Sequence, residues 1–421
     1  MPFAFLVADP FTPTLLLLAL LWAGAKLGGE LALRLKLPSV VGELSAGLVF
    51  SALHKYWPTF PDAGGSAEAG VLANVGVLLL MFAVGLESTV PQMLRVGLAS
   101  VRVAILGIVL PVALGLTGAW FLLPAGTPGV VGLFMAACLC ATSIGISVQV
   151  LREKDMAASP EGRIIVGAAV IDDVLGLLVL VAVSALVAAS GTGSGLPWMS
   201  LAKSMGLALA FLALALTQGR KGTPHLFRLA SRLRSEQILL PLGLALAFLL
   251  AWTGGQVGLA PIIGAYAAGL ILEPATVELL EEREKHSLEE LLHPLVSVLA
   301  PLFFVVIGAR VDVGALLAPQ SLLLATVLAG LGIIGKYFAG YGGGRGLSTS
   351  IIGWGMVPRG EVGLVFVAVG SQLSLGGKPL LTPEWEAAIV GAILLTTLAG
   401  PVGLNWVLAQ RRGSPVPEEK G

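Results

Sequence analysis

The stretch IIVGAAVIDDVLGLLVLVAVSALVAA, residues 164–189, decides the fold of this chain. Apart from Asp172 and Asp173, its residues are apolar or small. A helix needs about 20 mainly apolar residues to cross a bilayer, so the stretch predicts a membrane-spanning helix. A charge near the middle of such a helix costs roughly 2.5–3.5 kcal/mol, and it persists where it pairs with another charge or lines an ion pathway. Asp172 and Asp173 are therefore the first candidates for a functional site.

Lys336 is a third charge of this kind, because it lies in the equally apolar stretch 322–338. Of the 421 residues, 56% are hydrophobic and 12% are charged, whereas soluble proteins carry about 25% charged residues. The formal net charge is zero, so the overall charge does not favour nucleic acid as a partner. The composition predicts an all-α polytopic membrane protein.

The cysteines and histidines point to no cofactor. Cys138 and Cys140 lie two residues apart in an apolar run, so on a helix they face different directions and act as small hydrophobic residues. The four histidines are scattered and show no metal-ligand spacing. We therefore expect neither an enzyme nor a resident metal.

About thirteen apolar runs, separated by Gly, Pro and charge clusters, are candidate spans. The first is followed by basic residues instead of being preceded by them, which indicates a retained helix and not a signal peptide. The predicted limits are 12–28, 38–53, 68–86, 97–123, 127–150, 161–189, 199–218, 235–254, 257–273, 289–309, 318–341, 347–373 and 384–410.

The basic residues test the orientation of these spans, because cytoplasmic loops are enriched in Lys and Arg. With the N-terminus outside, they divide about 19 to 4 in favour of the inner loops. One missed span would scramble this division, so we expect the N-terminus outside and the C-terminus inside. The inner set is Lys26, Arg34, Lys36, Arg95, Arg102, Arg152, Lys154, Arg163, Arg220, Lys221, Arg228, Arg232, Arg234, Arg283, Lys285, Arg345, Arg411, Arg412 and Lys420, and the outer set is Lys55, Lys203, Arg310 and Lys378.

Spans four to six and eleven to thirteen then form two three-helix units of opposite orientation, which is the usual plan of a secondary transporter. The middle helix of each unit should be interrupted. In span five, the run ATSIGIS, residues 141–147, places hydroxyls and a glycine at mid-helix. In span twelve, Gly353, Gly355, Pro358 and Gly360 crowd the middle. Small residues also serve helix packing, but their matching positions in the two units favour interrupted helices.

The two aspartates should divide their work, because adjacent helical residues point about 100° apart. One carboxylate would bind a cation or a proton, with the hydroxyls of Thr142 and Ser143 as auxiliary ligands of a hard cation. The other would pair with Lys336. Competition between a cation and a proton for one carboxylate is enough to make an antiporter. If cation binding also makes Lys336 release a proton, two protons move per sodium ion and the exchange is electrogenic.

Other readings of the deep charges are a structural ion-pair cluster, an intramembrane aspartyl protease and a passive channel. A protease needs two carboxylates from facing helices that share a proton, and a channel needs a symmetry axis or rings of charge. The sequence shows neither pattern.

Arg359 and Glu361 are expected to hold the interrupted helix structurally, and Glu43 and Glu87 to lie near helix ends as packing or gating residues.

Four further segments carry a resemblance to a known family. They are LPSVVGELSAG (37–47), LLMFAVGLE (79–87), GLAPIIGA (258–265) and PLFFVVIG (301–308). Together with the aspartate pair, they make the chain resemble the cation:proton antiporter-2 family, and within it the bacterial sodium/proton antiporters of the NapA type. The matching segments span most of the chain.

The resemblance implies a homodimer in which a mobile core moves in an elevator motion against a dimerisation domain. It also implies that Asp173 is the principal ion ligand, that Asp172 pairs with Lys336, that Thr142 lies where the interrupted helices cross, and that the double aspartate marks electrogenic exchange. The expected division is 1–96 and 221–317 for the dimerisation domain, 97–190 and 318–410 for the core, 191–220 for a linker helix and 411–421 for a cytoplasmic tail.

The expected function is electrogenic exchange of sodium or lithium for protons in a prokaryotic inner membrane. Membrane lipids are the other expected partners, and we expect no binding of nucleic acid. The alternative is a potassium/proton antiporter on the same scaffold. Potassium-efflux relatives carry a soluble nucleotide-binding domain after the last span and usually lack the second acidic residue. We expect no such domain here, and both aspartates are present, so the resemblance favours sodium.

Overall fold

The structure is a computed structural model. It describes residues 11–35, 37–87, 97–154, 156–157, 159–190, 206–207, 210–211, 213–231, 237–257, 259–272 and 284–413. Nearly all of these residues are helical, and they form two compact units, each built from two separate stretches of chain. Unit 1 takes in residues 1–89 and 206–315, and unit 2 takes in residues 90–205 and 316–421.

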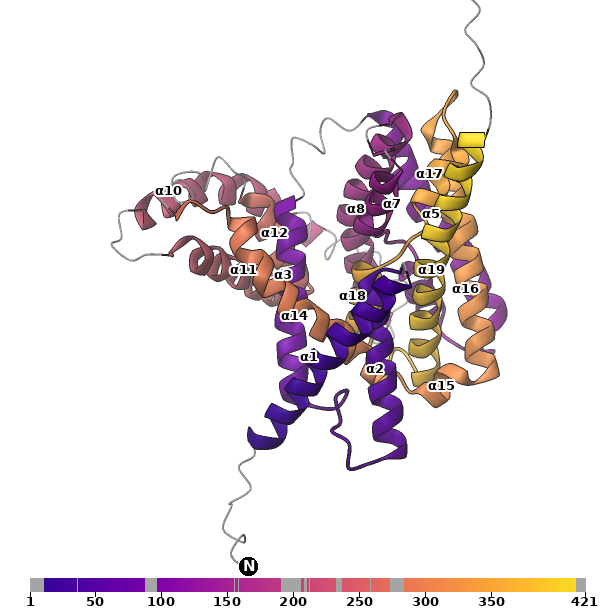
Figure 1. Cartoon of the computed structure of the whole chain (residues 1–421), viewed down its shortest axis with the longest axis horizontal. Coiled ribbons are helices and arrows are strands. Elements are labelled where there is room, and N and C mark those ends of the chain that lie inside the picture. The colour runs from indigo at the N-terminus through magenta and orange to yellow at the C-terminus, as the bar shows by residue number, and fades with distance from the viewer. Residues whose placement is uncertain are drawn as a thin grey trace, which may run out of the picture. The chain divides into compact units, whose positions relative to one another are not determined.

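Unit 1 contains three helices from the N-terminal stretch and a second set from the middle of the chain (Figure 1). Within it, α14 packs against α2 and α3, while α12 packs against α3 and α11. The helices are α1 (Phe11–Arg34), α2 (Ser39–Tyr56), α3 (Ala67–Glu87), a π-helical segment (Ala215–Gly219), α10 (Arg220–Ala230), α11 (Leu239–Gln256), α12 (Pro261–Ile271) and α14 (Leu288–Arg310).

The glycines of the sequence motifs lie where these helices touch. A Cβ atom on Gly47 of α2 would lie 2.8 Å from the Cα atom of Gly308 in α14. A Cβ atom on Gly85 of α3 would lie 3.0 Å from the Cα atom of Gly269 in α12. No side chain fits at such contacts, because the backbones themselves are in van der Waals contact. The motifs behind the family resemblance are therefore packing motifs of unit 1.

A proline inside α14 is compensated by a residue of α1. Pro301 has no N–H group, so the carbonyl of Ser297 one turn earlier loses its helical partner. Lys26 of α1 donates to this carbonyl at 3.0 Å, and Trp22 Nε1 donates to the next carbonyl, that of Val298, at 3.1 Å. These two bonds hold α1 against the proline-containing part of α14.

Unit 2 is built around α16, which packs against α5 on one side and α19 on another (Figure 1). In turn, α8 packs against α5 and α6. The short helix α15 (Val313–Leu317) leads from unit 1 into unit 2. The helices of unit 2 are α5 (Leu98–Leu122), α6 (Gly129–Ala137), α7 (Ile144–Glu153), α8 (Pro160–Ser190), α16 (Pro319–Ala339), a 3-10 turn (Gly340–Gly343), α17 (Thr349–Gly355), α18 (Glu361–Gly370) and α19 (Pro383–Gly413).

A short antiparallel hairpin joins α18 to α19. Its strands are β1 (Ser374–Leu375) and β2 (Lys378–Pro379), with Leu375 opposite Lys378. Gly376 and Gly377 form the turn with φ angles of +60° and +79°. Two successive positive φ angles define the tight hairpin turn that matches strand twist, and glycine adopts them without strain.

Eight helices among the described residues are long and apolar enough to cross a membrane, namely α1, α3, α5, α8, α11, α14, α16 and α19. Each coincides with a predicted span. Of the other predicted spans, 38–53 corresponds to α2 and 257–273 to the shorter α12, and the two that were expected to be interrupted are split. The beginning of the span at 199–218 lies outside the described residues.

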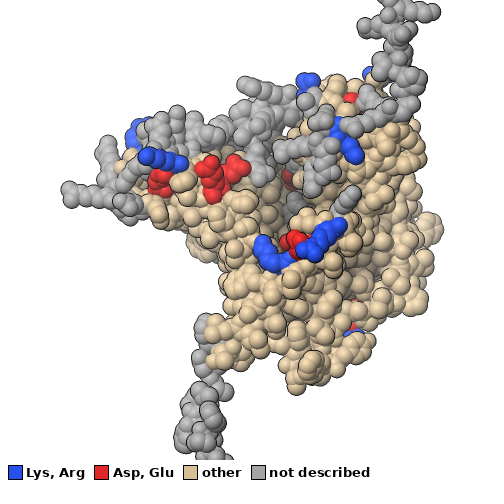
Figure 2. Space-filling model, viewed as in Figure 1, with Lys and Arg blue, Asp and Glu red and all other residues tan. Residues whose placement is uncertain are grey.

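The described surface suits a lipid environment. On the face shown in Figure 2, Lys, Arg, Asp and Glu gather in a few small groups and most of the rest is uncharged. Large apolar side chains are exposed on the long helices; Leu27, Trp120 and Phe121 are 72%, 78% and 78% exposed. Many large apolar side chains exposed on long helices are typical of a surface that contacts membrane or a partner. With eight long apolar helices, it makes this a multi-pass membrane protein.

Candidate functional site

Two interrupted helices meet inside unit 2. The first breaks between the end of α6 at Ala137 and the start of α7 at Ile144. The second breaks between the end of α17 at Gly355 and the start of α18 at Glu361. Both interruptions were predicted, but the first, 138–143, begins before the stretch 141–147 that signalled it, and the second covers only 356–360. Ile144 to Ser147 are already helical, and Gly353 and Gly355 belong to α17.

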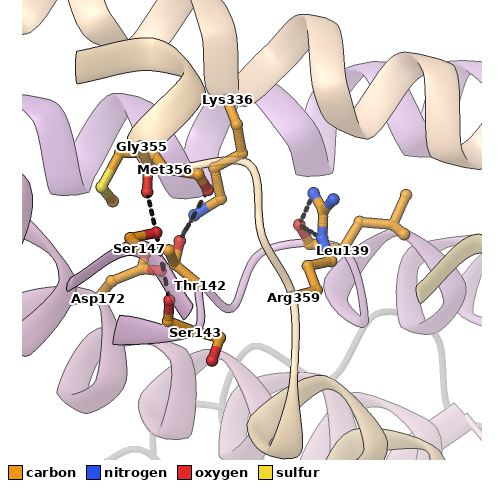
Figure 3. A network of polar contacts seen from close by, with 9 residues as sticks. All are labelled: Leu139, Thr142, Ser143, Ser147, Asp172, Lys336, Gly355, Met356 and Arg359. Carbon is orange, nitrogen blue, oxygen red and sulfur yellow. Dashed lines mark hydrogen bonds and ion pairs between the residues drawn. The ribbon is translucent and has the colours of Figure 1, made fainter. Parts of the chain in front are cut away.

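The two breaks cross and are joined by hydrogen bonds (Figure 3). The backbone N–H of Ser143 donates to the carbonyl of Pro358 at 2.9 Å. The Thr142 hydroxyl donates to the carbonyl of Met356 at 3.2 Å, and the Ser147 hydroxyl donates to that of Gly355 at 2.6 Å. An interrupted helix leaves backbone groups without helical partners, and buried groups of this kind must find partners elsewhere. Here the polar groups in and beside each break find their hydrogen-bond partners at the other break.

Gly360 lets the second break approach the first closely. A Cβ atom at this position would lie 2.9 Å from Ser143 Oγ and 3.0 Å from Ser143 Cβ. The crossing therefore depends on a missing side chain in the second break and on a small hydroxyl residue in the first.

A buried ion pair lies beside this crossing. Lys336 Nζ on α16 donates to Asp172 Oδ2 on α8 at 3.0 Å, and both side chains are 0% exposed. The pairing joins residues 164 positions apart. The sequence predicts that Lys336 pairs with one of the two aspartates, and in the structure this aspartate is Asp172.

Asp173 follows Asp172 on α8 and is 5% exposed. Because successive helical residues point in different directions, its carboxylate cannot lie where that of Asp172 lies. Thr142 and Ser143, the proposed auxiliary ligands, are 2% and 3% exposed at the crossing. Two carboxylates and two hydroxyls are thus buried within unit 2, and oxygen donors of this kind suit a hard monovalent cation.

Arg359 in the second break is wholly buried and reaches the end of α6. Its Nε donates to the carbonyl of Leu139 at 2.9 Å, and its Nη2 donates to the same oxygen. The carboxyl end of a helix carries a partial negative charge, which the guanidinium neutralises at the first break. Arg359 therefore ties the second break to the end of α6, and its predicted structural role stays a prediction. The side chain of Glu361 lies outside the described part of the structure.

Three further polar residues belong to the site, and of these the sequence indicated only Ser147, as a hydroxyl in the run 141–147. Ser147 binds the end of α17, as described above. Thr397 in α19 donates from Oγ1 to the carbonyl of Arg359. Glu161 is buried in the first turn of α8, and its Oε1 accepts from the N–H of Ser348, the N-cap residue of α17, at 3.3 Å. The adjacent threonines 396 and 397 in an apolar helix were a usable signal. Nothing in the sequence indicates the Glu161 contact, because it joins segments far apart.

Glu43 and Glu87 belong to unit 1. Glu43 is 7% exposed in α2 and lies against Gly29 of α1, where a Cβ atom would be 3.4 Å from its Oε1. Glu87 is the last residue of α3, and its side chain lies outside the described part of the structure. The expected packing or gating role of the two residues stays a prediction.

The chain is similar to known sodium/proton antiporters. The sequence profile of a family described as sodium/hydrogen exchanger, transmembrane, matches residues 17–410. The chain is 34% identical over 442 residues to the high-affinity Na(+)/H(+) antiporter NhaS3 of Synechocystis sp., across 96% of this chain and 92% of that protein. It is 33% identical over 402 residues to the Na(+)/H(+)-K(+) antiporter GerN of Bacillus cereus, across 94% and 96%.

A potassium-efflux protein is also similar. The chain is 29% identical over 390 residues to the glutathione-regulated potassium-efflux system protein KefC of Klebsiella pneumoniae, across 92% of this chain but 59% of that protein. Among solved structures, the sodium proton antiporter MjNhaP1 from Methanocaldococcus jannaschii matches with a TM-score of 0.73 and 17% identity, across 96% and 100% of the two chains. At that identity the likeness concerns the fold.

Proposed function

The chain belongs to the sodium/hydrogen exchanger family, and from this premise we propose that it exchanges sodium or lithium for protons across a membrane. The observation that carries the proposal is the buried Asp172–Lys336 pair with Asp173 beside it, at the crossing of two interrupted helices. Deep charges are costly and are kept where ions move. The antiporters NhaS3 and GerN support the choice of ions.

In the proposed cycle, Asp173 is the carrier. A cation arriving at its carboxyl group displaces the proton, and the proton returns when the cation leaves. Thr142 and Ser143 would add oxygen ligands. When the cation also draws Asp172 away from Lys336, the ammonium group loses the charge that holds its proton and releases it. Two protons then move against one sodium ion, so the exchange is electrogenic.

The proposed movement is an elevator motion of unit 2, as the core, against unit 1, as the dimerisation domain of a homodimer. One feature supports this assignment: all the described residues of the crossing and its ion pair belong to unit 2. The proposed setting is a prokaryotic inner membrane, with about thirteen spans and two inverted repeats.

Purified protein in sealed proteoliposomes tests the function directly. An imposed proton gradient is followed with a pH-sensitive dye while sodium, lithium or potassium is added. Dissipation of the gradient by sodium and lithium supports the proposal. A response to potassium alone supports the second candidate, a potassium/proton antiporter, which the similarity to GerN and KefC favours. No response to any of the three cations refutes both.

Asp173→Asn should abolish exchange without unfolding the protein, because an amide can neither take up nor release a proton in the working pH range. The matched control is Glu384→Gln, which neutralises an exposed carboxylate in the first turn of α19 of the same unit. Full exchange by the Asp173 variant would remove it as the carrier.

A further inference from the structure

The backbones of α5 and α16 approach each other closely immediately before Lys336. A Cβ atom on Gly335 would lie 2.6 Å from the backbone nitrogen of Pro111 and 2.8 Å from its Cα. Because these distances are too short for any side chain, the backbones of the two helices touch at this point. The position of Lys336 on α16 is thereby set relative to Pro111 on α5.

Pro111 changes the hydrogen bonding of α5. It lies inside the helix, where every other residue type would donate its N–H to the carbonyl four residues earlier. Proline has no N–H, so the carbonyl of Gly107 loses that donor. A buried carbonyl has a strong tendency to accept a hydrogen bond, and Pro111 cannot supply one to Gly107.

Lys336 lies directly against Gly107. A Cβ atom on Gly107 would lie 3.4 Å from Lys336 Nζ and 3.7 Å from its Cδ. An ammonium group has three N–H donors. Among the described residues, Asp172 is the hydrogen-bond partner of Lys336, and it uses one of them. A buried lysine with spare donors is therefore adjacent to the residue whose carbonyl a proline has released.

We propose that the Gly107 carbonyl is the second docking position of Lys336, occupied when Asp172 is neutralised or engaged by a cation. Pro111 keeps that carbonyl available, which makes Pro111 and Gly107 positioning residues for the exchange. The role of this contact in the transport cycle rests on the proposed function. The geometry of the contact does not. Lys336 keeps N–H donors both as an ammonium group and, after it has released its proton, as a neutral amine. Without such an acceptor, a lysine released from Asp172 would be left buried with no partner, and that state would be strongly disfavoured.

Pro111→Ala tests the proposal, because alanine restores the N–H that binds the Gly107 carbonyl. Thermal unfolding of the detergent-solubilised protein is compared for the wild type, Pro111→Ala, Asp172→Asn and the double variant. Asp172→Asn imitates the neutralised carboxyl group and so makes Lys336 depend on its second position. We expect Pro111→Ala to lower the Tm of the Asp172→Asn protein by at least about 2 °C more than that of the wild type, since contacting groups are not additive.

Pro294→Ala is the matched control. It removes an exposed proline from the interior of α14 in unit 1, and should shift the Tm equally in both backgrounds. Pro111→Gly restores the same N–H and replaces Pro111→Ala if that variant does not fold. Equal Tm shifts from Pro111→Ala in the two backgrounds would overturn the proposal. This comparison needs no transport, so it can be read even if the protein carries neither sodium nor lithium.

Transport gives a second readout. In proteoliposomes, Pro111→Ala should raise the KM for sodium roughly two- to ten-fold, the range that corresponds to the net worth of one hydrogen bond, with a smaller change in kcat. A merely structural effect of the proline would instead reduce the amount of active protein and leave KM unchanged, and that outcome also counts against the proposal.

Discussion

At the scale of single residues, the pair of Asp172 and Lys336 is the most informative feature, because burying two charges costs free energy. Removing two charges from water costs several kcal/mol for each ion, and their attraction offsets this only when the geometry is good. The Nζ–Oδ2 distance is 3.0 Å and both side chains are buried. The attraction within such a pair adds little net stability. Its presence is better explained by a lysine and an aspartate that must change partners.

Lys336→Gln should destabilise the protein strongly. It leaves the Asp172 carboxylate buried without a cation, and the loss of one partner from a buried pair typically costs about 3–5 kcal/mol. The measurement is thermal or denaturant unfolding in detergent. Asp172→Asn in combination with Lys336→Gln should recover part of the loss, because no charge is then unpaired. If the Tm of the single variant equals that of the wild type, the two side chains do not pair in the protein.

Among the elements, prolines inside membrane helices matter through the carbonyl groups that they release. In α14 the carbonyl released by Pro301 is bound by Lys26 of α1. In α5 the corresponding carbonyl belongs to Gly107 beside Lys336. The same covalent cause therefore leads to a static contact between helices in unit 1 and, on our proposal, to an exchangeable one in unit 2.

Gly335→Ala should disrupt the α5–α16 contact, because its methyl group would overlap the backbone of Pro111 at 2.6–2.8 Å. The helices would have to separate, which we expect to cost about 1–3 kcal/mol, as overpacking usually does. Gly330→Ala in the same helix is the control. A Cβ atom there meets nothing within 4 Å, so that variant should be neutral or slightly stabilising through helix propensity. Equal Tm values for the two variants would show that the contact is loose.

On the scale of the whole molecule, the division into two units determines what can move. The chain passes between the units three times, near residues 89, 205 and 315. Every described residue of the crossing and the ion pair lies in unit 2. A movement of unit 2 as one body would carry the ion-binding groups without breaking the contacts that hold them together, which is the requirement of an elevator mechanism.

The orientation of the whole chain provides a further prediction. The charge division between the predicted loops predicts an N-terminus outside and a C-terminus inside. A protease-cleavable tag at the N-terminus should therefore be cut in cells whose outer membrane is permeabilised and whose inner membrane is intact. The same tag at the C-terminus should be cut only after lysis. Cleavage of both tags, or of neither, would mean an even number of spans and would refute the odd count.

The sequence by itself determined which elements form, because span length, apolar periodicity and the placement of Gly and Pro are local properties of the chain. Residues 164–189 had to be a membrane helix, and both helix interruptions could be predicted from small residues at mid-span. The pairing of an aspartate with Lys336 could also be predicted, since few buried charges of opposite sign were available to choose from.

Only the tertiary structure decided the contacts whose partners are ordinary residues. The carbonyls of Leu139, Gly355 and Met356 belong to every peptide bond alike, so no side-chain type marks them as partners of Arg359, Ser147 and Thr142. The nearness of Gly107 to Lys336 likewise depends on two helices that meet at Pro111 and Gly335. Backbone groups carry no label in the sequence, and three-dimensional packing alone selects which of them a buried charge can reach.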